Sequence, residues 1–174
     1  MKKETRSLLK MRAINMAAES GQKLDSSAVI EIIEFTLASE IYGVESSFVR
    51  EVYQIKDFTL LPGVPSFILG IVNVRGLILP LLDLKILFNL PERGLGELNR
   101  AIILHDEVME FGILADEVNG TKVLYKEDIL PAPTTITGIG EKYIKGVTKD
   151  RLILLSAENL LTDKSIVINE KVTN

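Results

Sequence analysis

The most informative feature of this sequence is a weak internal duplication. Apolar residues and glycines recur in the same order in both halves, with spacings that differ where loops are expected. The first half contains Tyr42-Gly43-Val44, Val49, Val52, Leu61-Pro62, Ile68, Gly70-Ile71, Leu77-Ile78-Leu79, Asp83-Leu84 and Leu87. The second half contains Phe111-Gly112-Ile113, Val118, Val123, Leu130-Pro131, Ile144, Gly146-Val147, Leu152-Ile153-Leu154, Glu158 and Leu160-Leu161. A repeat of this kind predicts two similar small barrels that share one core, because each alone is too small to bury its apolar surface.

The apolar pattern from Val29 onward is typical of short strands. Ile33, Phe35 and Leu37 alternate with Glu34 and Thr36, as expected for a half-buried strand. A tight turn is predicted at 39–40, and further strands at 41–44, 51–55, 70–74, 77–82, 100–105, 110–118, 122–125, 144–147 and 151–155. Many short strands separated by Gly, Pro and Asn indicate a mainly β fold of barrels or a sandwich.

The predicted helices are few and short. Asp83 is expected to cap a helix that ends near Phe88, because its carboxylate can accept the free N–H groups of the first turn. Residues 6–20 are predicted to form an amphipathic helix with Leu9, Ala13, Met16 and Ala17 on one face. We favour the interpretation that this helix packs on its own domain or frays. The alternative is that it lies on an acidic membrane surface. The expected organisation is an N-terminal helix and linker at 1–27, a domain at 28–165 and a tail at 166–174.

Composition excludes most kinds of enzyme chemistry. The chain has no cysteine, no tryptophan and one histidine, which removes disulfides, thiolate ligands and most histidine-based relays. Residues 1–27 carry six basic and three acidic side chains, so within an overall charge of −4 the remainder carries −7. An acidic body is a poor phosphate binder, so a nucleic-acid partner is not expected. No apolar run approaches the ~20 residues that span a bilayer, so we expect a cytoplasmic protein without direct membrane insertion.

The run Asn73-Val74-Arg75-Gly76 is the sharpest local signal. An arginine beside glycine at a strand bend is either a structural charge paired with a carboxylate such as Glu51 or an exposed docking group. Arginine is a frequent anchor at interfaces because its planar fork makes several directed bonds. The sequence leaves these two alternatives open.

Other polar groups do not form a catalytic pattern. The pairs Asp116-Glu117 and Glu127-Asp128 are adjacent in sequence, so on a strand their side chains point to opposite faces and do not converge on one point. His105-Asp106-Glu107 is expected to form a solvated turn between strands. Gly138-Ile139-Gly140 is followed by no lysine or helix of a phosphate loop. We therefore expect no catalytic residue, no metal site, no cofactor and no small-molecule substrate.

From Ile33 to Leu161 the chain resembles the CheW-like family of bacterial chemotaxis coupling proteins. The segments that carry the resemblance are Phe35-Thr36-Leu37, Tyr42-Gly43-Val44, Val49-Arg50-Glu51-Val52, the run from Pro65 to Gly76, the run from Ile78 to Leu84, the run from Gly112 to Val118, and Tyr143-Ile144-Lys145-Gly146-Val147. Each fragment is weak by itself, and their shared order is the specific signal. The most specific part is the G-x-x-N-x-R-G run that begins at Gly70 and contains Asn73, Arg75 and Gly76.

The resemblance implies two five-stranded SH3-like β-barrels around a shared core and no enzymatic activity. It implies an adaptor held between two partners, the cytoplasmic helical hairpin of a chemoreceptor and the regulatory domain of a CheA-type histidine kinase. The protein would then be peripheral to the inner membrane through receptor arrays. The receptor hairpin would lie in an apolar groove between the barrels. By analogy, Val49, Glu51, Gly70 and Arg75 match partner-contact positions, and Ile78 lines the groove. The predicted partner-binding set consists of seven residues, these five together with Asn73 and Gly76.

Two features depart from the family pattern. The N-terminal helix lies outside the domain, and Arg50 places a cation beside the expected contact, where many relatives are neutral. Both leave the choice of partner open. The alternatives are a scaffold in another kinase pathway, such as pilus motility, or a small-molecule-binding barrel.

Overall fold

The computed structural model describes residues 25–91, 100–133, 138 and 140–166, and strands dominate this part of the chain. The strands are β1 Val29–Leu37, β2 Glu40–Glu45, β3 Val49–Gln54, β4 Ile68–Val74, β5 Leu77–Leu82, β6 Arg100–His105, β7 Glu110–Ala115, β8 Glu117–Tyr125, β9 Ile129–Leu130, β10 Ile144–Thr148 and β11 Ile153–Leu155. Two short α-helices, α2 Leu84–Leu87 and α3 Ala157–Thr162, follow β5 and β11. Single 3-10 turns lie at η1 Ser26–Ala28, η2 Ser46–Phe48, η3 Lys126–Asp128 and η4 Glu141–Tyr143.

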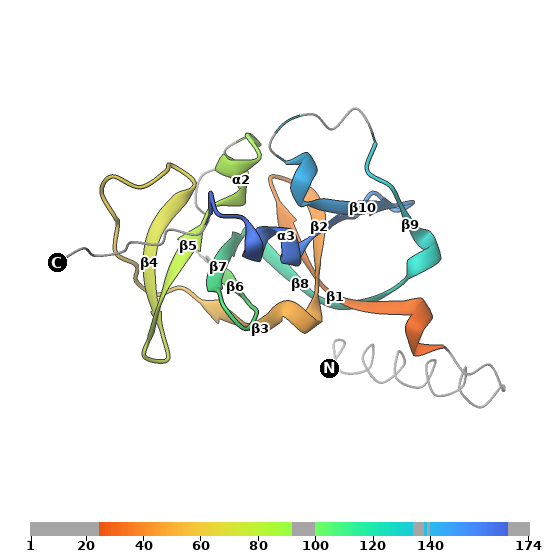
Figure 1. Cartoon of the computed structure of the whole chain (residues 1–174), viewed down its shortest axis with the longest axis horizontal. Helices are drawn as coiled ribbons and strands as arrows, with labels where there is room; N and C mark the ends of the chain where they lie inside the picture. Colours follow the sequence, from red (N-terminus) through yellow and green to blue (C-terminus); the bar gives the residue numbers. More distant parts are fainter. Residues whose placement is uncertain (1–24, 92–99, 134–137, 139, 167–174) are drawn as a thin grey trace, which may run out of the picture.

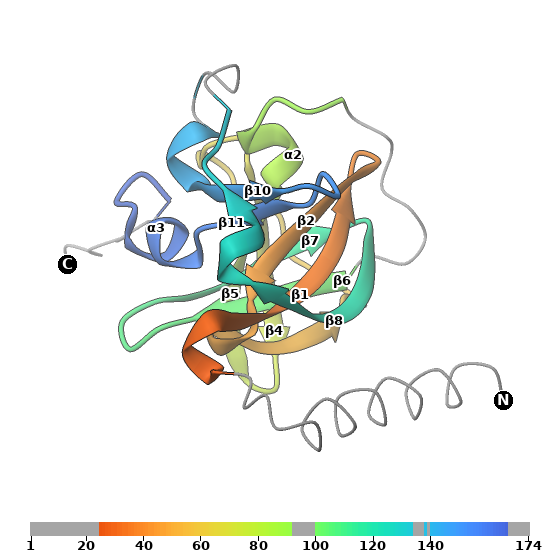
Figure 2. The same cartoon turned by 90° about the vertical axis from the view of Figure 1, so that its right-hand side faces the viewer.

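The strands form two sheets that lie side by side (Figure 1). One has five strands in the order β3-β6-β7-β5-β4. The other, which faces the viewer in Figure 2, has six strands in the order β8-β1-β2-β11-β10-β9. The mainly β fold class is therefore confirmed. The second sheet has one strand more than predicted, because the two residues of β9 pair with Val147 and Thr148 of β10.

The two sheets do not correspond to the two halves of the sequence. β5 of the first half pairs in parallel with β7 of the second, with Leu81 opposite Gly112. In the same way β11 pairs in parallel with β2, with Leu154 opposite Gly43. Each half therefore contributes strands to both sheets, and neither sheet can form without the other half.

The pairing register confirms the repeat and corrects its alignment. Gly70 lies opposite Leu81 and Gly146 lies opposite Leu154, each next to a register shift. The equivalent of Leu152-Ile153-Leu154 is therefore Leu79-Pro80-Leu81, two residues later than the predicted match Leu77-Ile78-Leu79. The capping residue changes accordingly: Ser156, and not Glu158, occupies the place of Asp83, and each accepts a backbone N–H of the helix that follows.

The apolar side chains divide into one large shared core and two smaller ones. The shared core lies between the sheets and contains Phe35, Leu82, Ile102, Phe111 and Leu160 among its buried members. One smaller cluster fills the five-stranded sheet, including Val72, Val74, Leu79, Leu81 and Ile103. The other fills the six-stranded sheet with Ile32, Leu124, Leu152 and Leu154. This confirms the predicted shared core, and the aligned repeat positions Leu79 and Leu152 serve the two separate interiors.

Several local predictions are wrong in detail. The strand predicted at 110–118 is broken at Asp116, whose N–H donates to the Thr36 carbonyl while the chain passes from β7 to β8. The strand predicted at 122–125 is the end of the long β8. The last strand begins at Ile153, because Arg151 has a left-handed φ of 64° in the preceding turn. The turn before β2 is made by Ala38 and Ser39, which have φ of 49° and 75°, so that Glu40 already belongs to the strand. The helix predicted at 6–20 and the tail after residue 166 lie outside the described residues.

Asp163 joins the end of α3 to η4. Burial of its carboxyl by itself raises the pKa, but hydrogen bonds donated by Lys142, Ser165 and Tyr143 outweigh it and hold the pKa of Asp163 well below its ordinary value of 3.8. The Tyr143 hydroxyl donates to Oδ2 at 2.6 Å, and the Ser165 hydroxyl donates to Oδ1 at 2.6 Å.

This arrangement predicts a pH dependence of stability. A carboxylate whose folded-state pKa is depressed stabilises the fold fully above the unfolded pKa of about 4, and that contribution is lost as the pH falls below it. We expect Asp163→Asn to lower the unfolding temperature at neutral pH and to flatten its decline between about pH 4 and pH 2. Thermal unfolding followed by circular dichroism measures both, with Asp150→Asn, at an exposed position of the turn before β11, as control. An unchanged acid profile in Asp163→Asn would contradict the assignment.

Candidate functional site

The β4–β5 hairpin carries most of the residues singled out in the sequence. Its two-residue turn is Arg75-Gly76, with φ of 53° and 89°, as type I′ turns require. The Asn73 side chain accepts a hydrogen bond from the Gly76 N–H at 2.9 Å, which fixes the turn. Asn73 and Gly76 therefore shape the hairpin, whose turn contains Arg75. The β4–β5 hairpin lies at the lower left of Figure 1.

Arg75 is both exposed and paired. Its Nε donates to the Glu51 carboxylate at 3.0 and 3.2 Å, while 77% of the Arg75 side chain and 21% of the Glu51 side chain remain exposed. Glu51 belongs to β3 and Arg75 follows β4, and these are the two edge strands of the five-stranded sheet. The ion pair thus joins the two edges of that sheet. The structural ion pair left open by the sequence is present, and most of the Arg75 side chain remains exposed to solvent.

The second repeat lacks this feature. Ten residues separate Gly70 from its strand partner Leu81, whereas seven separate Gly146 from Leu154, so the hairpin of the first repeat is longer. At the position equivalent to Glu51, the second repeat has Gly120, which lies at the same register shift opposite Glu34. The fold itself therefore requires neither the hairpin extension nor the ion pair. An addition confined to one copy is typical of a site that serves a function other than folding.

The remaining predicted site residues differ in position and exposure. Ile78, on β5, is 59% exposed, next to Leu77 at 44%. Val49 is partly buried and packs against the shared core, as does Val118, its equivalent in the second repeat. Ile78 thus presents an apolar side chain at the surface, whereas Val49 lies at the edge of the shared core.

Gly70 has an internal role. A Cβ on Gly70 would lie 2.1 Å from the carbonyl oxygen of Thr59, because the segment at Thr59 crosses directly over it. Thr59 and Ile71 exchange backbone hydrogen bonds at 2.8 and 2.9 Å, which hold that segment in place. The glycine is therefore needed for a close approach inside the protein, and its predicted part in partner contact stays a prediction.

Arg50, the cation that departs from the family pattern, is also paired. It forms an ion pair with Glu110 of β7 while about half of its side chain remains exposed. Its charge is thus partly neutralised within the domain.

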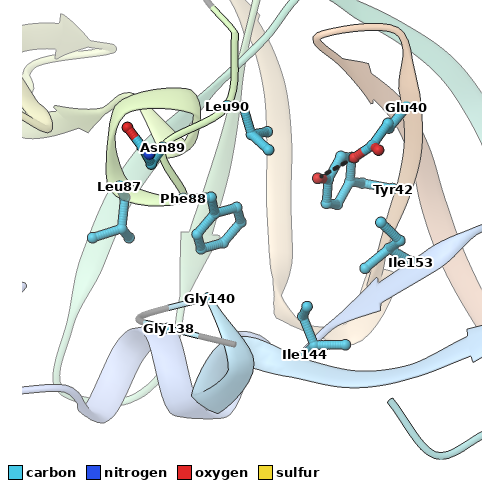
Figure 3. A pocket seen from close by; sticks show the side chains of 10 residues that line it. All are labelled: Glu40, Tyr42, Leu87, Phe88, Asn89, Leu90, Gly138, Gly140, Ile144 and Ile153. Carbon is cyan, nitrogen blue, oxygen red and sulfur yellow. Dashed lines mark hydrogen bonds between the residues drawn. The ribbon is translucent and has the colours of Figure 1, made fainter. Parts of the chain in front are cut away.

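A pocket that the sequence did not indicate lies between α2 and the six-stranded sheet (Figure 3). Its volume is about 410 Å³, and its apolar walls include Tyr42, Phe88, Leu90, Ile144 and Ile153. The Tyr42 hydroxyl donates to Glu40 at 3.0 Å; burial first, and then the Glu40 charge, raise the pKa of the phenol. None of the seven predicted site residues is among its described lining residues. The pocket could not be found from sequence because its walls come from both halves.

Neither of the two carboxylate pairs lies wholly on a strand, although the sequence analysis assumed that both do. Asp116 lies in the break between β7 and β8, and Glu127 and Asp128 lie in the 3-10 turn η3. Asp116 binds Lys85 and the N–H of Ala38, while its neighbour Glu117 is exposed. Asp106 accepts hydrogen bonds from the N–H groups of Val108 and Met109 and so closes the β6–β7 turn. In the described part of the chain, no group of three or more His, Cys, Asp or Glu side chains is arranged to hold a metal ion. Nor does any described helix have the length and apolar character needed to cross a membrane.

Comparison with known proteins places this geometry in a family. The sequence model of the CheW-like domain matches residues 31–165. The chemotaxis protein CheW of Treponema pallidum (strain Nichols) is 32% identical over 143 residues, which cover 78% of this chain and 84% of that protein. The CheW of Klebsiella aerogenes is 30% identical, covering 82% and 87%. Protein FrzA of Myxococcus xanthus is 37% identical over a shorter stretch that covers 52% of this chain and 57% of FrzA.

A solved structure agrees with these matches. The crystal structure of the scaffolding protein TtCheW from Thermoanaerobacter tengcongensis superposes with a TM-score of 0.67 at 32% identity, covering 73% of this chain and 88% of that one. Both the sequence of residues 31–165 and the paired-sheet architecture thus lead to one conclusion: the chain belongs to the CheW-like domain family.

Proposed function

We propose that this chain is a non-catalytic adaptor that couples methyl-accepting chemoreceptors to a CheA-type histidine kinase in bacterial chemotaxis. Family membership supports the scaffold role, since relatives carry the names chemotaxis protein CheW and scaffolding protein. The observation that carries the proposal is the β4–β5 hairpin extension. It presents Arg75 to solvent on a support that the second repeat lacks.

In this proposal Arg75 and Glu51 supply directed polar contacts to the receptor's helical hairpin. Ile78 and Val49 add apolar area beside them, and Asn73 and Gly76 hold the turn. An exposed arginine with its guanidinium pre-oriented by a carboxylate loses little conformational freedom on binding. Rigid arginine anchors of this kind are frequent among the few residues that dominate interface affinity.

The test separates binding from folding. We expect Arg75→Ala to weaken binding of a purified chemoreceptor cytoplasmic fragment by roughly tenfold or more, as for an interface anchor. The free energy of unfolding should change by less than about 1 kcal/mol, because the pair is exposed. Titration calorimetry measures the first quantity and urea unfolding the second.

Lys145→Ala is the matched control. Lys145 pairs with Glu45 at the surface, with side-chain exposures of 51% and 21%, and lies in the other sheet. It should leave receptor binding unchanged. If Arg75→Ala unfolds the chain but spares binding, Arg75 is a structural charge and the assignment of the site fails.

A second candidate is a scaffold in a different kinase pathway, since one relative, Protein FrzA, does not carry the name of a chemotaxis protein. Binding of a kinase regulatory domain without binding of any chemoreceptor fragment would support this candidate over chemotaxis.

A further inference from the structure

The outer face of β8 exposes two large apolar side chains. Val123 is 50% exposed and Tyr125 is 44% exposed, and both lie on the same face because they are two residues apart on one strand. Val29 of β1 lies directly opposite Tyr125 in the antiparallel pairing. We call these three residues the β8 patch.

The fold does not require this patch to be apolar. In the first repeat the position equivalent to Val123 is Gln54, since Gln54 lies opposite Arg100 as Val123 lies opposite Glu31. Gln54 is exposed and polar. An apolar pair retained in one repeat where the other is polar indicates that something covers it.

The chain itself enters the domain at this point. Asp25 caps η1, β1 begins at Val29, and Val29 is the strand partner of Tyr125. The 24 residues before Asp25 are therefore tethered beside the patch. A helix over residues 6–20 would be about 22 Å long, and β8, with nine residues, extends about 30 Å. The four residues at 21–24 span at most about 14 Å. The linker is therefore long enough for such a helix to lie along β8 and contact Val123.

Charge favours the same occupant. Residues 1–24 contain six basic and two acidic side chains. Around the patch lie the exposed carboxylates of Glu31, opposite Val123, and of Glu127, with the partly buried Asp128 beside it. One exposed cation, Lys126, follows Tyr125 directly. Lys122, the nearby cation on β8, is already paired with Glu34. An amphipathic basic segment with Leu9 and Met16 on one face complements an apolar patch with an acidic border.

We propose that residues 6–20 dock as a helix on the β8 patch of their own domain. The segment is then a built-in occupant of this face, and any partner that uses the face must displace it. This inference depends on the contacts of β1 and β8 and not on the proposed function.

The absence of cysteine allows a direct test with the full chain. Ser7→Cys, on the opposite side of the predicted helix from Leu9 and Met16, carries a nitroxide spin label on uniformly ¹⁵N-labelled protein. We expect the amide signals of residues 121–125 to lose most of their intensity in the oxidised label and to recover on reduction. In a Val123→Lys, Tyr125→Lys background the broadening should disappear while the rest of the spectrum is kept. The control variant Leu60→Lys changes an apolar side chain that is 68% exposed and lies outside the β8 patch, so it should leave the broadening at residues 121–125 unchanged.

Three results would overturn the proposal. The first is a lack of broadening at 121–125, and the second is broadening that persists in the double lysine variant. The third is broadening that falls on dilution with unlabelled chain, which would mean docking between two copies. If the label instead becomes immobilised only on vesicles containing anionic lipid, the segment binds membranes and not this domain.

Discussion

Gly70→Ala is expected to destabilise the protein by about 3 kcal/mol, at the upper end of the usual cost of overpacking. The added Cβ would lie 2.1 Å from the Thr59 carbonyl oxygen and 2.9 Å from its carbon. Both are backbone atoms, so no side-chain rotation can relieve the clash. The segment at Thr59 must move, which breaks its two hydrogen bonds with Ile71.

Gly140→Ala is the matched control for this measurement. Gly140 has an ordinary helical φ of −64°, and its Cβ would be 3.6 Å from the Phe88 ring, an ordinary contact. Its effect on the free energy of unfolding, measured in urea, should be small or slightly stabilising, because alanine restricts the unfolded chain. If Gly70→Ala is as stable as Gly140→Ala, the segment at Thr59 does not lie over β4 as described. The result also decides whether Gly70→Ala can be used to test partner contact. If the variant is unfolded, a loss of partner binding does not show that Gly70 touches the partner.

Asp116→Ala should cost about 3 kcal/mol, because it leaves the ammonium group of Lys85 buried without a counter-charge. Lys85 on α2 is 5% exposed, and its Nζ lies 2.5 Å from Asp116 Oδ1. The other carboxylate oxygen accepts the Ala38 N–H at 2.8 Å. One aspartate therefore ties α2, the β1–β2 turn and the start of β8 together.

A double variant distinguishes the cost of the unpaired Lys85 charge from the cost of the packing that is lost with the Asp116 side chain. In Lys85→Met, Asp116→Ala the charge and its partner are both removed, so most of the stability should return. The unpaired Ala38 N–H would still cost about 1 kcal/mol. Glu117→Ala, at the exposed neighbouring position, should change the free energy of unfolding by less than about 0.5 kcal/mol. A double variant no more stable than Asp116→Ala would show that Lys85 is not held as a buried charge.

The candidate site was partly predictable from the sequence because its main elements are local. A two-residue turn with glycine, an asparagine that binds its own turn and an arginine between them all occur within four consecutive residues, Asn73 to Gly76. The partner of Arg75 was one of several carboxylates that local sequence could not distinguish. Glu51 lies on the opposite edge strand, and only closure of the sheet brings it to 3.0 Å.

Most of the strands, the cap at Asp83, the repeat and the family resemblance could be predicted from the amino-acid sequence, although several strand boundaries were wrong. These follow from periodicity and turn chemistry within a few residues. The tertiary structure alone decided that β2 pairs with β11 and β7 with β5, so that the halves exchange strands. It also decided the internal role of Gly70 and the buried pair of Lys85 with Asp116. The physical reason is that any strand has backbone groups able to pair with any other. The strand partner is therefore selected by packing of the shared core between residues far apart in the sequence, 31 residues for Leu81 and Gly112 and 111 for Tyr42 and Ile153. A local sequence pattern does not contain this information.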